Sequence, residues 1–161
     1  MAKERRMVKA IEEQFHRVFF TWREEIKNVP TKEWKKGDID YLIPARHLVH
    51  ILEVADFYVS DKSVDEYEWG KLFGGDWEEM KPRELPSKKV ALEQLTKVKR
   101  VITSKLRKLD DKALYGKEKQ SPWTGPILGA KLIYTLRHCQ HHVGITHAEL
   151  RRRGIKRGGW R

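Results

Sequence analysis

The chain has 161 residues and a formal charge of +11, from 34 lysine and arginine residues against 23 acidic ones. With 39% apolar and 10% aromatic residues, it is too apolar for a disordered chain and long enough for one domain with a hydrophobic core. Its apolar runs are shorter than the roughly 18 residues of a membrane span, and its N-terminus lacks the apolar core of a secretory signal. The single cysteine, Cys139, excludes an intrachain disulfide and a CxxC-type zinc site, and it favours a cytoplasmic location.

The first half of the chain predicts two helices. From Lys3 to Lys27, apolar residues recur at spacings of three and four and form one buried stripe: Val8, Ile11, Phe15, Val18, Trp22 and Ile26. Pro30 ends this helix, and a polar connector follows over residues 31–42. A second helix is predicted from Pro44 to Ser60, and because it is apolar on most faces we expect it to lie deep in the fold.

The second half of the chain predicts two more helices, which follow a long loop. Residues 61–85 show no helical stripe, and we interpret this aromatic-rich loop as a crossover between two parallel helices that serves as a lid, a dimer surface or ordinary packing. Ser87 is a candidate cap for a third helix that extends to Leu109. A fourth helix is predicted from Pro126 to Arg153, and Gly154 is expected to end it.

Four long amphipathic segments predict an all-α protein of four-helix-bundle architecture. We assign residues 1–154 to one helical domain and residues 155–161 to a basic C-terminal tail. The last eleven residues carry six basic side chains, and without them the other 150 residues have a charge of only +5. We interpret the basic segment as a solvated helix end, although it could also contact phosphate groups of nucleic acid or an anionic membrane.

Histidines are the residues with the clearest potential for chemistry, since four of the seven lie between positions 138 and 147. His138 and His142 are four residues apart, which places both imidazoles on one face of a helix, where they could share a metal ion. His50 lies within the most apolar helix and could supply a third ligand if the second and fourth helices are neighbours. Three imidazoles without a thiolate favour zinc or nickel and leave a coordination position open.

Alternatives to a metal site remain for each residue. His50 could be a core histidine that donates to a backbone carbonyl, and the pair on the fourth helix could line a solvated face. His47 is a reserve ligand, and Cys139 is expected to be a small core residue. The remaining histidines are expected at the surface: His16, His141 and His147. For His141, a supporting role next to the metal ligands is also open.

Two carboxylates are candidates for orienting an imidazole or for acting as a general base on a metal-bound water. Glu53 follows His50 by three residues, and Glu149 follows His142 by seven, so each shares a helical face with its histidine. These two assignments depend on spacing alone.

The segment from His138 to Gly154 reads HCQHHVGITHAELRRRG and resembles the signature HxxHHxGQxxxxLRxxG, which ends the last helix of DinB/YfiT-like proteins. Upstream, His50 and the apolar and acidic residues that follow it resemble the second-helix histidine of the same family. The resemblance extends over almost the whole chain in order and spacing, but its specific part is about 30 residues long. Two departures are Ile145, where the family often has Gln, and Val143, where Arg is usual.

The resemblance implies a four-helix bundle in up-down-down-up order, with three histidines that bind a divalent metal at one end. Carried over by position, the ligands are His50, His138 and His142. Family members are commonly homodimers, and those with a known reaction are metal-dependent thiol S-transferases that use bacillithiol or mycothiol, or relatives of maleylpyruvate isomerase. The resemblance therefore implies a small-molecule substrate together with a low-molecular-weight thiol.

Three hypotheses about function follow. The first is a metal-dependent enzyme of the thiol S-transferase or hydrolase type. The second is a basic helical module that binds nucleic acid or protein, motivated by the charge of +11. The third is an interaction protein that keeps a vestigial or structural metal site. We favour the first, and we expect neither a membrane nor a nucleic acid as a partner.

Overall fold

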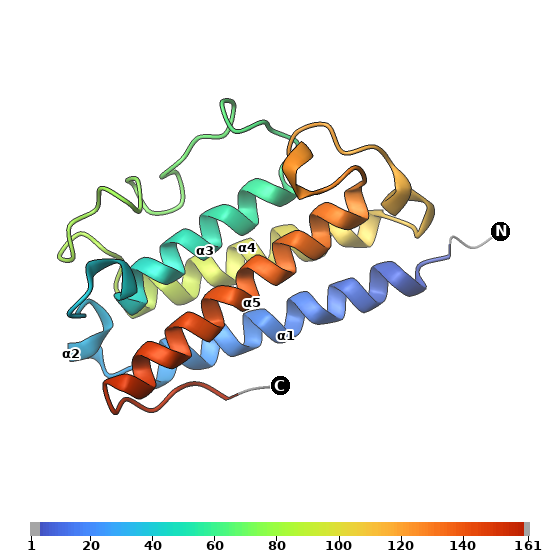
Figure 1. Cartoon of the computed structure of the whole chain (residues 1–161). Coiled ribbons are helices and arrows are strands. Elements are labelled where there is room, and N and C mark those ends of the chain that lie inside the picture. The colour runs from blue at the N-terminus through green and yellow to red at the C-terminus, as the bar shows by residue number, and fades with distance from the viewer. Residues whose placement is uncertain (1–3, 160–161) are drawn as a thin grey trace.

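The computed structural model describes residues 4–159, which form a bundle of four long helices (Figure 1). The long helices are α1 (Arg6–Asn28), α3 (Pro44–Val59), α4 (Lys88–Lys108) and α5 (Leu128–Arg152). The connections contain a short helix, α2 (Thr31–Trp34), and the 3-10 turns η1 (Asp40–Leu42), η2 (Lys112–Tyr115) and η3 (Pro122–Thr124). Within residues 4–159, extended pairing is limited to one isolated bridge between Lys117 and Ile127. The predicted all-α class is confirmed.

Local sequence signals explain where the long helices begin and end. The Ser87 hydroxyl accepts a hydrogen bond from the Val90 amide (3.3 Å) and caps α4, and Pro44 occupies the first turn of α3. α5 stops before Gly154, whose φ of +65° is a backbone conformation that glycine adopts at low cost. The predicted start of the first helix, Lys3, lies outside the described residues, and α1 begins at Arg6.

The short helical turns were not predicted. α2 has four residues and η1 has three, so neither is long enough to show a helical repeat of apolar residues. The same holds for η2 and η3 in the connection that precedes α5.

The helices are arranged in up-down-down-up order, with α1 and α5 running one way and α3 and α4 the other (Figure 1). At one end of the bundle, Lys88 at the start of α4 donates to the Val29 carbonyl just after α1 (2.7 Å). At the opposite end, Arg5 donates to the Leu109 carbonyl just after α4 (2.7 Å). α1 and α3 each pack against both α4 and α5. Because α3 and α4 are parallel, residues 60–87 cross the length of the bundle, as expected from the sequence.

The core is formed by the apolar stripes that the sequence predicted. All six stripe residues of α1 are buried, and the α4 stripe contributes a second row: Ala91, Leu95, Val98, Ile102 and Leu106. Each large side chain in this core contributes about 1.5–3 kcal/mol relative to an exposed position. None of the helices within residues 4–159 has an apolar stretch that would cross a lipid bilayer.

The connection 60–87 is held against the bundle by side chains of α3. Arg46, which is buried, donates to the carbonyl of Met80 (2.5 Å), and Tyr67 donates to the Asp56 carboxylate (2.8 Å). The connection therefore forms a fixed cover over the outer side of α3, as Figure 1 shows.

The basic C-terminal segment lies against the bundle as far as it is described. Arg152 forms ion pairs with Glu149 and Asp38, and the Ile155 amide donates to the Leu150 carbonyl (2.8 Å). These contacts support the interpretation of a helix end rather than a free basic tail. The last two residues of the predicted tail, 160 and 161, lie outside the described part of the chain.

Candidate metal centre

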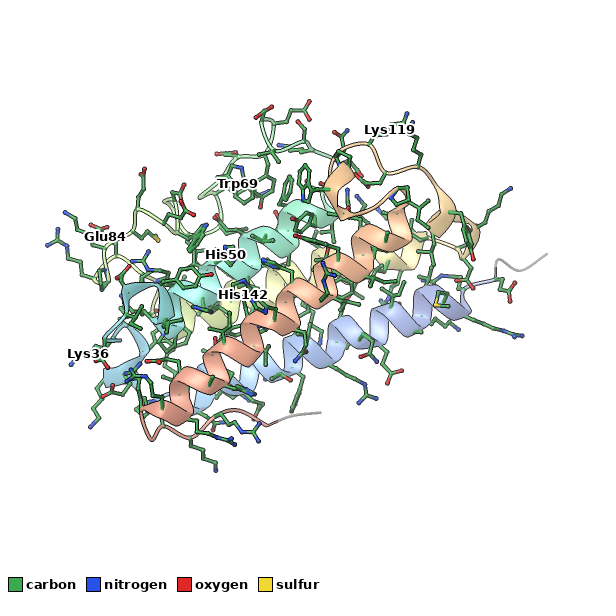
Figure 2. The ribbon with its side chains drawn as sticks, in the orientation of Figure 1. Lys36, His50, Trp69, Glu84, Lys119 and His142 are labelled. Carbon is green, nitrogen blue, oxygen red and sulfur yellow. The ribbon has the colours of Figure 1, made fainter. Side chains whose placement is uncertain are left out.

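α3 and α5 bring three histidines together across their interface. His50 lies on α3, and His138 and His142 lie one turn apart on the facing side of α5. Figure 2 shows the His50 and His142 side chains between the two helices. The cluster lies near the middle of α5, so the location at one end of the bundle, which the resemblance implied, is not what the structure shows.

The three imidazoles are close enough to share one ion. One ring nitrogen from each residue lies within 4.8 Å of the others, and the group consists of His50, His138 and His142. The ring centroids are 4.7 Å apart for His50 and His142, 4.7 Å for His138 and His142, and 5.1 Å for His50 and His138. In a tetrahedral site with metal–nitrogen bonds of about 2.1 Å, ligand nitrogens are roughly 3.4 Å apart, so small side-chain rotations bring the three into range.

Burial keeps these imidazoles neutral at ordinary pH. Desolvation lowers the pKa of His50 and His142 to about 3 and that of His138 to about 4, and electrostatic repulsion from neighbouring histidines adds to the effect. A neutral imidazole has a free lone pair and can ligate a metal, whereas a protonated one cannot.

Two ring nitrogens of the cluster are buried without a hydrogen-bond partner among the described residues. These are the Nδ1 atoms of His50 and His138. A buried polar atom left in this state costs about 1–3 kcal/mol. The donor set is all nitrogen, which suits zinc or nickel, and three ligands leave a position for water or substrate.

Cys139 does not join the centre although it follows His138 directly. Its side chain is completely buried in the core, and burial raises the pKa of its thiol to about 12. The residue is thus a small core side chain, as predicted from its position on the helix.

His47, the reserve ligand, lies beside the cluster. Its Nδ1 is 3.4 Å from the Nδ1 of His142 and 3.4 Å from the Thr146 hydroxyl, and its ring is buried. Desolvation lowers its pKa to about 4. The contact with a ring nitrogen of His142 places His47 where it can orient that imidazole.

Glu53 is directed toward the connection 60–87. Its carboxylate accepts a long hydrogen bond from the Leu72 amide (3.5 Å), and its second oxygen has no partner within residues 4–159. Burial raises the pKa of Glu53 to about 7. A supporting role for Glu53 at His50 therefore stays a prediction.

Glu149 pairs with Arg152 and not with His142. Its two oxygens accept hydrogen bonds from Arg152 (2.8 and 2.9 Å), and this pairing holds the pKa of Glu149 below its ordinary value. It also acts electrostatically on His47, whose pKa it raises slightly against the larger effect of burial. Its proposed role at His142 likewise stays a prediction.

Aromatic rings that the sequence did not assign to the site surround the histidines. The Trp77 ring lies 4.2 Å from the His50 ring, and the Tyr134 ring is nearly parallel to that of His138 at 6.4 Å. Tyr134 precedes His138 by four residues, so helical spacing could have identified it. Trp77 comes from the connection 60–87, and no local pattern predicts which helix that connection covers.

The remaining histidines are not members of the three-histidine group, although the His141 ring lies 5.2 Å from that of His142. His141 is exposed on α5, and His16 is 3.2 Å from the Thr103 hydroxyl on the other side of the bundle. His147 was expected at the surface, and this is wrong: its side chain is 12% exposed and forms an ion pair with the buried Glu25 of α1. The parallel packing of α1 and α5 creates this contact, which spacing within one helix cannot reveal.

The fold and the histidine cluster define a class: a four-helix bundle with a candidate three-histidine centre. The structure is similar to the crystal structure of a DinB-like protein from Bacillus cereus ATCC 10987, with a TM-score of 0.67. The match covers 95% of this chain and 97% of that chain at 17% sequence identity, which establishes a shared fold. No protein-family model and no curated protein sequence matches the chain. The predicted resemblance is thus confirmed at the level of the fold.

Proposed function

We propose that the protein binds one divalent metal ion, zinc or nickel, through His50, His138 and His142, and that it is a metal-dependent enzyme of the thiol S-transferase or hydrolase type. The observation that carries the proposal is the convergence of three neutral imidazoles from two helices on one point. Such a donor set, with an open position, is typical of catalytic zinc sites.

A metal in this position would act as a Lewis acid and lower the pKa of a thiol or water bound at the open position. The residues of the chain would supply the surroundings. His47 would hold the His142 ring, and the Trp77 and Tyr134 rings lie beside His50 and His138.

Metal content is the first test of this proposal. The untagged protein, loaded with zinc and desalted, is expected to contain about one metal ion per chain by inductively coupled plasma mass spectrometry. His142→Ala should lose this metal, whereas His141→Ala, its exposed neighbour on α5, should retain it. Equal metal content in the two variants would contradict the assignment.

Activity requires a separate test, because metal binding alone fits a structural or vestigial site as well. The zinc-loaded protein is assayed for conjugation of bacillithiol or mycothiol to 1-chloro-2,4-dinitrobenzene, and for hydrolysis of p-nitrophenyl acetate. A rate above background that His142→Ala abolishes supports an enzyme. Bound metal without either activity favours the interaction-protein alternative.

A second candidate function, polyanion binding, is favoured by the charge of one helix. α4 carries eight lysine and arginine residues against Glu93 alone, a net +7 of the +11 for the whole chain. Two of these residues form ion pairs, Lys105 with Asp61 and Arg107 with Glu12. Several others are exposed on the outer face of the bundle: Lys89, Lys97, Arg100 and Lys108.

This candidate is tested with a labelled DNA duplex at low salt, followed over increasing salt concentration. Binding through phosphates should weaken steeply with salt, and Lys97→Gln with Arg100→Gln should reduce it. Lys32→Gln with Lys81→Gln, at exposed positions away from α4, serves as the matched control. Absence of binding in low salt would remove the candidate and agree with the expectation from the sequence.

We also propose that the protein is a cytoplasmic homodimer, as the resemblance implies. Analytical ultracentrifugation tests the dimer, with a mass of about twice the 19.1 kDa of the chain as the expected result. The buried Cys139 requires no oxidising compartment, which supports the location.

A further inference from the structure

A cavity of about 280 Å³ lies at the end of the bundle where α3 and α4 finish and α5 begins. The connection between α4 and α5 forms its outer wall, and none of the three clustered histidines lines it. Its floor is apolar: Val59, Ile102, Leu106, Leu109, Leu128 and Leu132. A concave, mostly apolar space with a few polar groups at its wall is the usual form of a small-molecule site.

A buried lysine supplies the polar group that matters most. Lys131, in the first turns of α5, lines the cavity, and its side chain is only 6% exposed. Its ammonium lies 2.9 Å from the Glu118 carboxylate, which is its acceptor within residues 4–159. An ammonium group has three N–H donors, so two of them are left without an acceptor among residues 4–159.

Contacts on both oxygens hold the Glu118 carboxylate in place. One oxygen accepts the amides of Gln120 (2.7 Å) and Ser121 (2.8 Å), and the other accepts Lys131. Burial alone would raise the pKa of Glu118, but the hydrogen bonds from Lys131 and Ser121 outweigh it, and the pKa is lowered. The carboxylate therefore stays ionised and fixes the position of the lysine.

The charge around the cavity favours an anion. Four lysines line it against two acidic residues, Asp61 and Glu118, which gives a net charge of +2. Lys131 is the buried member of the four, and the others lie at the rim: Lys105, Lys117 and Lys119.

The volume sets the size of the ligand. At about 280 Å³, the cavity is at the small end of the range for ligand sites, which suits a small organic ion with few non-hydrogen atoms. This is the size of a benzoate or hexanoate ion, whose apolar part fits the leucine-rich floor and whose carboxylate has two acceptor oxygens.

We propose that this cavity binds a small carboxylate with an apolar body, and that its carboxylate accepts hydrogen bonds from Lys131. The site lies about two helical turns from His138 along α5, roughly 10 Å by the rise of the helix. It is a second binding site, separate from the proposed metal centre, and its test does not depend on that centre.

The experiment is a titration of the full chain with sodium benzoate and sodium hexanoate, followed by nuclear magnetic resonance with EDTA present. EDTA removes any metal, which would otherwise offer a rival site for the carboxylate. Benzyl alcohol and hexanol, which have the same apolar parts without the charge, are the ligand controls. Saturable shifts confined to residues around Lys131 are the expected result for the two acids, with the alcohols at least about tenfold weaker.

Variants identify the group that recognises the carboxylate. Lys131→Met alone leaves Glu118 buried and unpaired and could unfold the chain, so the decisive variant combines Lys131→Met with Glu118→Gln. It should fold with unchanged circular dichroism and bind benzoate at least about tenfold more weakly. Lys112→Met, an exposed neighbour that does not line the cavity, should bind as the parent does.

Two results would overturn the proposal. One is the absence of saturable binding of both acids to the parent chain. The other is equal binding of benzoate by the parent and the folded double variant, which would show that Lys131 does not hold the carboxylate.

Discussion

α4 and α5 each contribute one face to the core of the same bundle, but the side chains that they bury differ in polarity. Every buried residue of α4 is apolar: Ala91, Leu95, Val98, Ile102 and Leu106. α5 buries a comparable apolar set and, between those residues, several polar side chains: Lys131, Thr135, His142, Thr146 and Glu149. Because polar burial costs free energy unless partners are present, the buried polar groups of α5 need partners that the apolar residues of α4 do not, and both proposed binding sites include residues of α5.

The comparison predicts that core truncation in α4 has the largest effect on folding. Ile102→Ala should lower the free energy of unfolding by about 2–5 kcal/mol, because it leaves a cavity beside fully buried neighbours. Urea denaturation of the metal-free protein measures this loss. His142→Leu in α5 is the matched change, and it should cost much less in the same assay, since it replaces a buried imidazole with an apolar side chain of similar size. A larger loss of unfolding free energy for His142→Leu than for Ile102→Ala would contradict this difference between the two helices.

Bound metal should stabilise the protein only when the histidines of α5 are intact, and a truncation in the core face of α4 should not alter this effect. At a free zinc concentration 100 times the dissociation constant, mass action adds about 2.7 kcal/mol to the free energy of unfolding. Differential scanning calorimetry with and without zinc should therefore show a raised melting temperature in the parent and in Ile102→Ala. The shift should vanish in His138→Ala, and a shift that persists there would place the metal elsewhere.

The stability of the metal-free protein should depend on pH through the clustered histidines. Their pKa values are lowered to about 3–4 in the folded state, so the unfolded chain binds more protons once the pH falls below about 6.5. Stability should thus decrease from pH 7 toward pH 4. The raised pKa of Glu53, about 7, acts in the opposite direction over part of this range, because folding then favours its protonated form.

The two contributions are separated by comparing variants. Urea unfolding at several pH values should give a shallower dependence when His50, His138 and His142 are replaced together by leucine. Glu53→Gln should make the dependence steeper. Identical pH profiles for the parent and the triple variant would contradict the low histidine pKa values.

The smallest effects are expected at two glycines of α5 and its end. Gly144 is an exposed helical position with no atoms within 4 Å of an added Cβ, so Gly144→Ala should raise stability by about 0.5–1 kcal/mol. Gly154 has a φ of +65°, and Gly154→Ala should lower stability by about 1 kcal/mol. Thermal melts resolve changes of this size, and the same sign for both variants would contradict the assigned backbone conformations.

The sequence predicts the buried residues of α4 more completely than those of α5. The α4 stripe follows directly from apolar spacing, because every buried position there is apolar. On α5, spacing identified His138 and His142, and the choice of His50 required the assumption that α3 and α5 are neighbours, which the structure bears out. The long crossover and the cap at Ser87 were also predictable from local signals.

Other features depend on contacts between distant segments. The position of Trp77 over His50 and the pairing of His147 with Glu25 join residues 27 and 122 positions apart in the chain. The cavity beside Lys131 likewise requires the ends of three helices and a connection to meet. No periodicity or motif in one segment encodes such contacts, and so the sequence alone did not reveal them.

The central claim is that three imidazoles from α3 and α5 hold one metal ion, and X-ray absorption spectroscopy of the zinc-loaded protein tests it most directly. The account predicts a first shell of nitrogen and oxygen atoms at about 2.0–2.1 Å, with the outer-shell scattering of three imidazole rings. His142→Ala, if it still takes up zinc, should lose part of the imidazole scattering. A sulfur shell at about 2.3 Å, or a spectrum with a single imidazole, would contradict the claim.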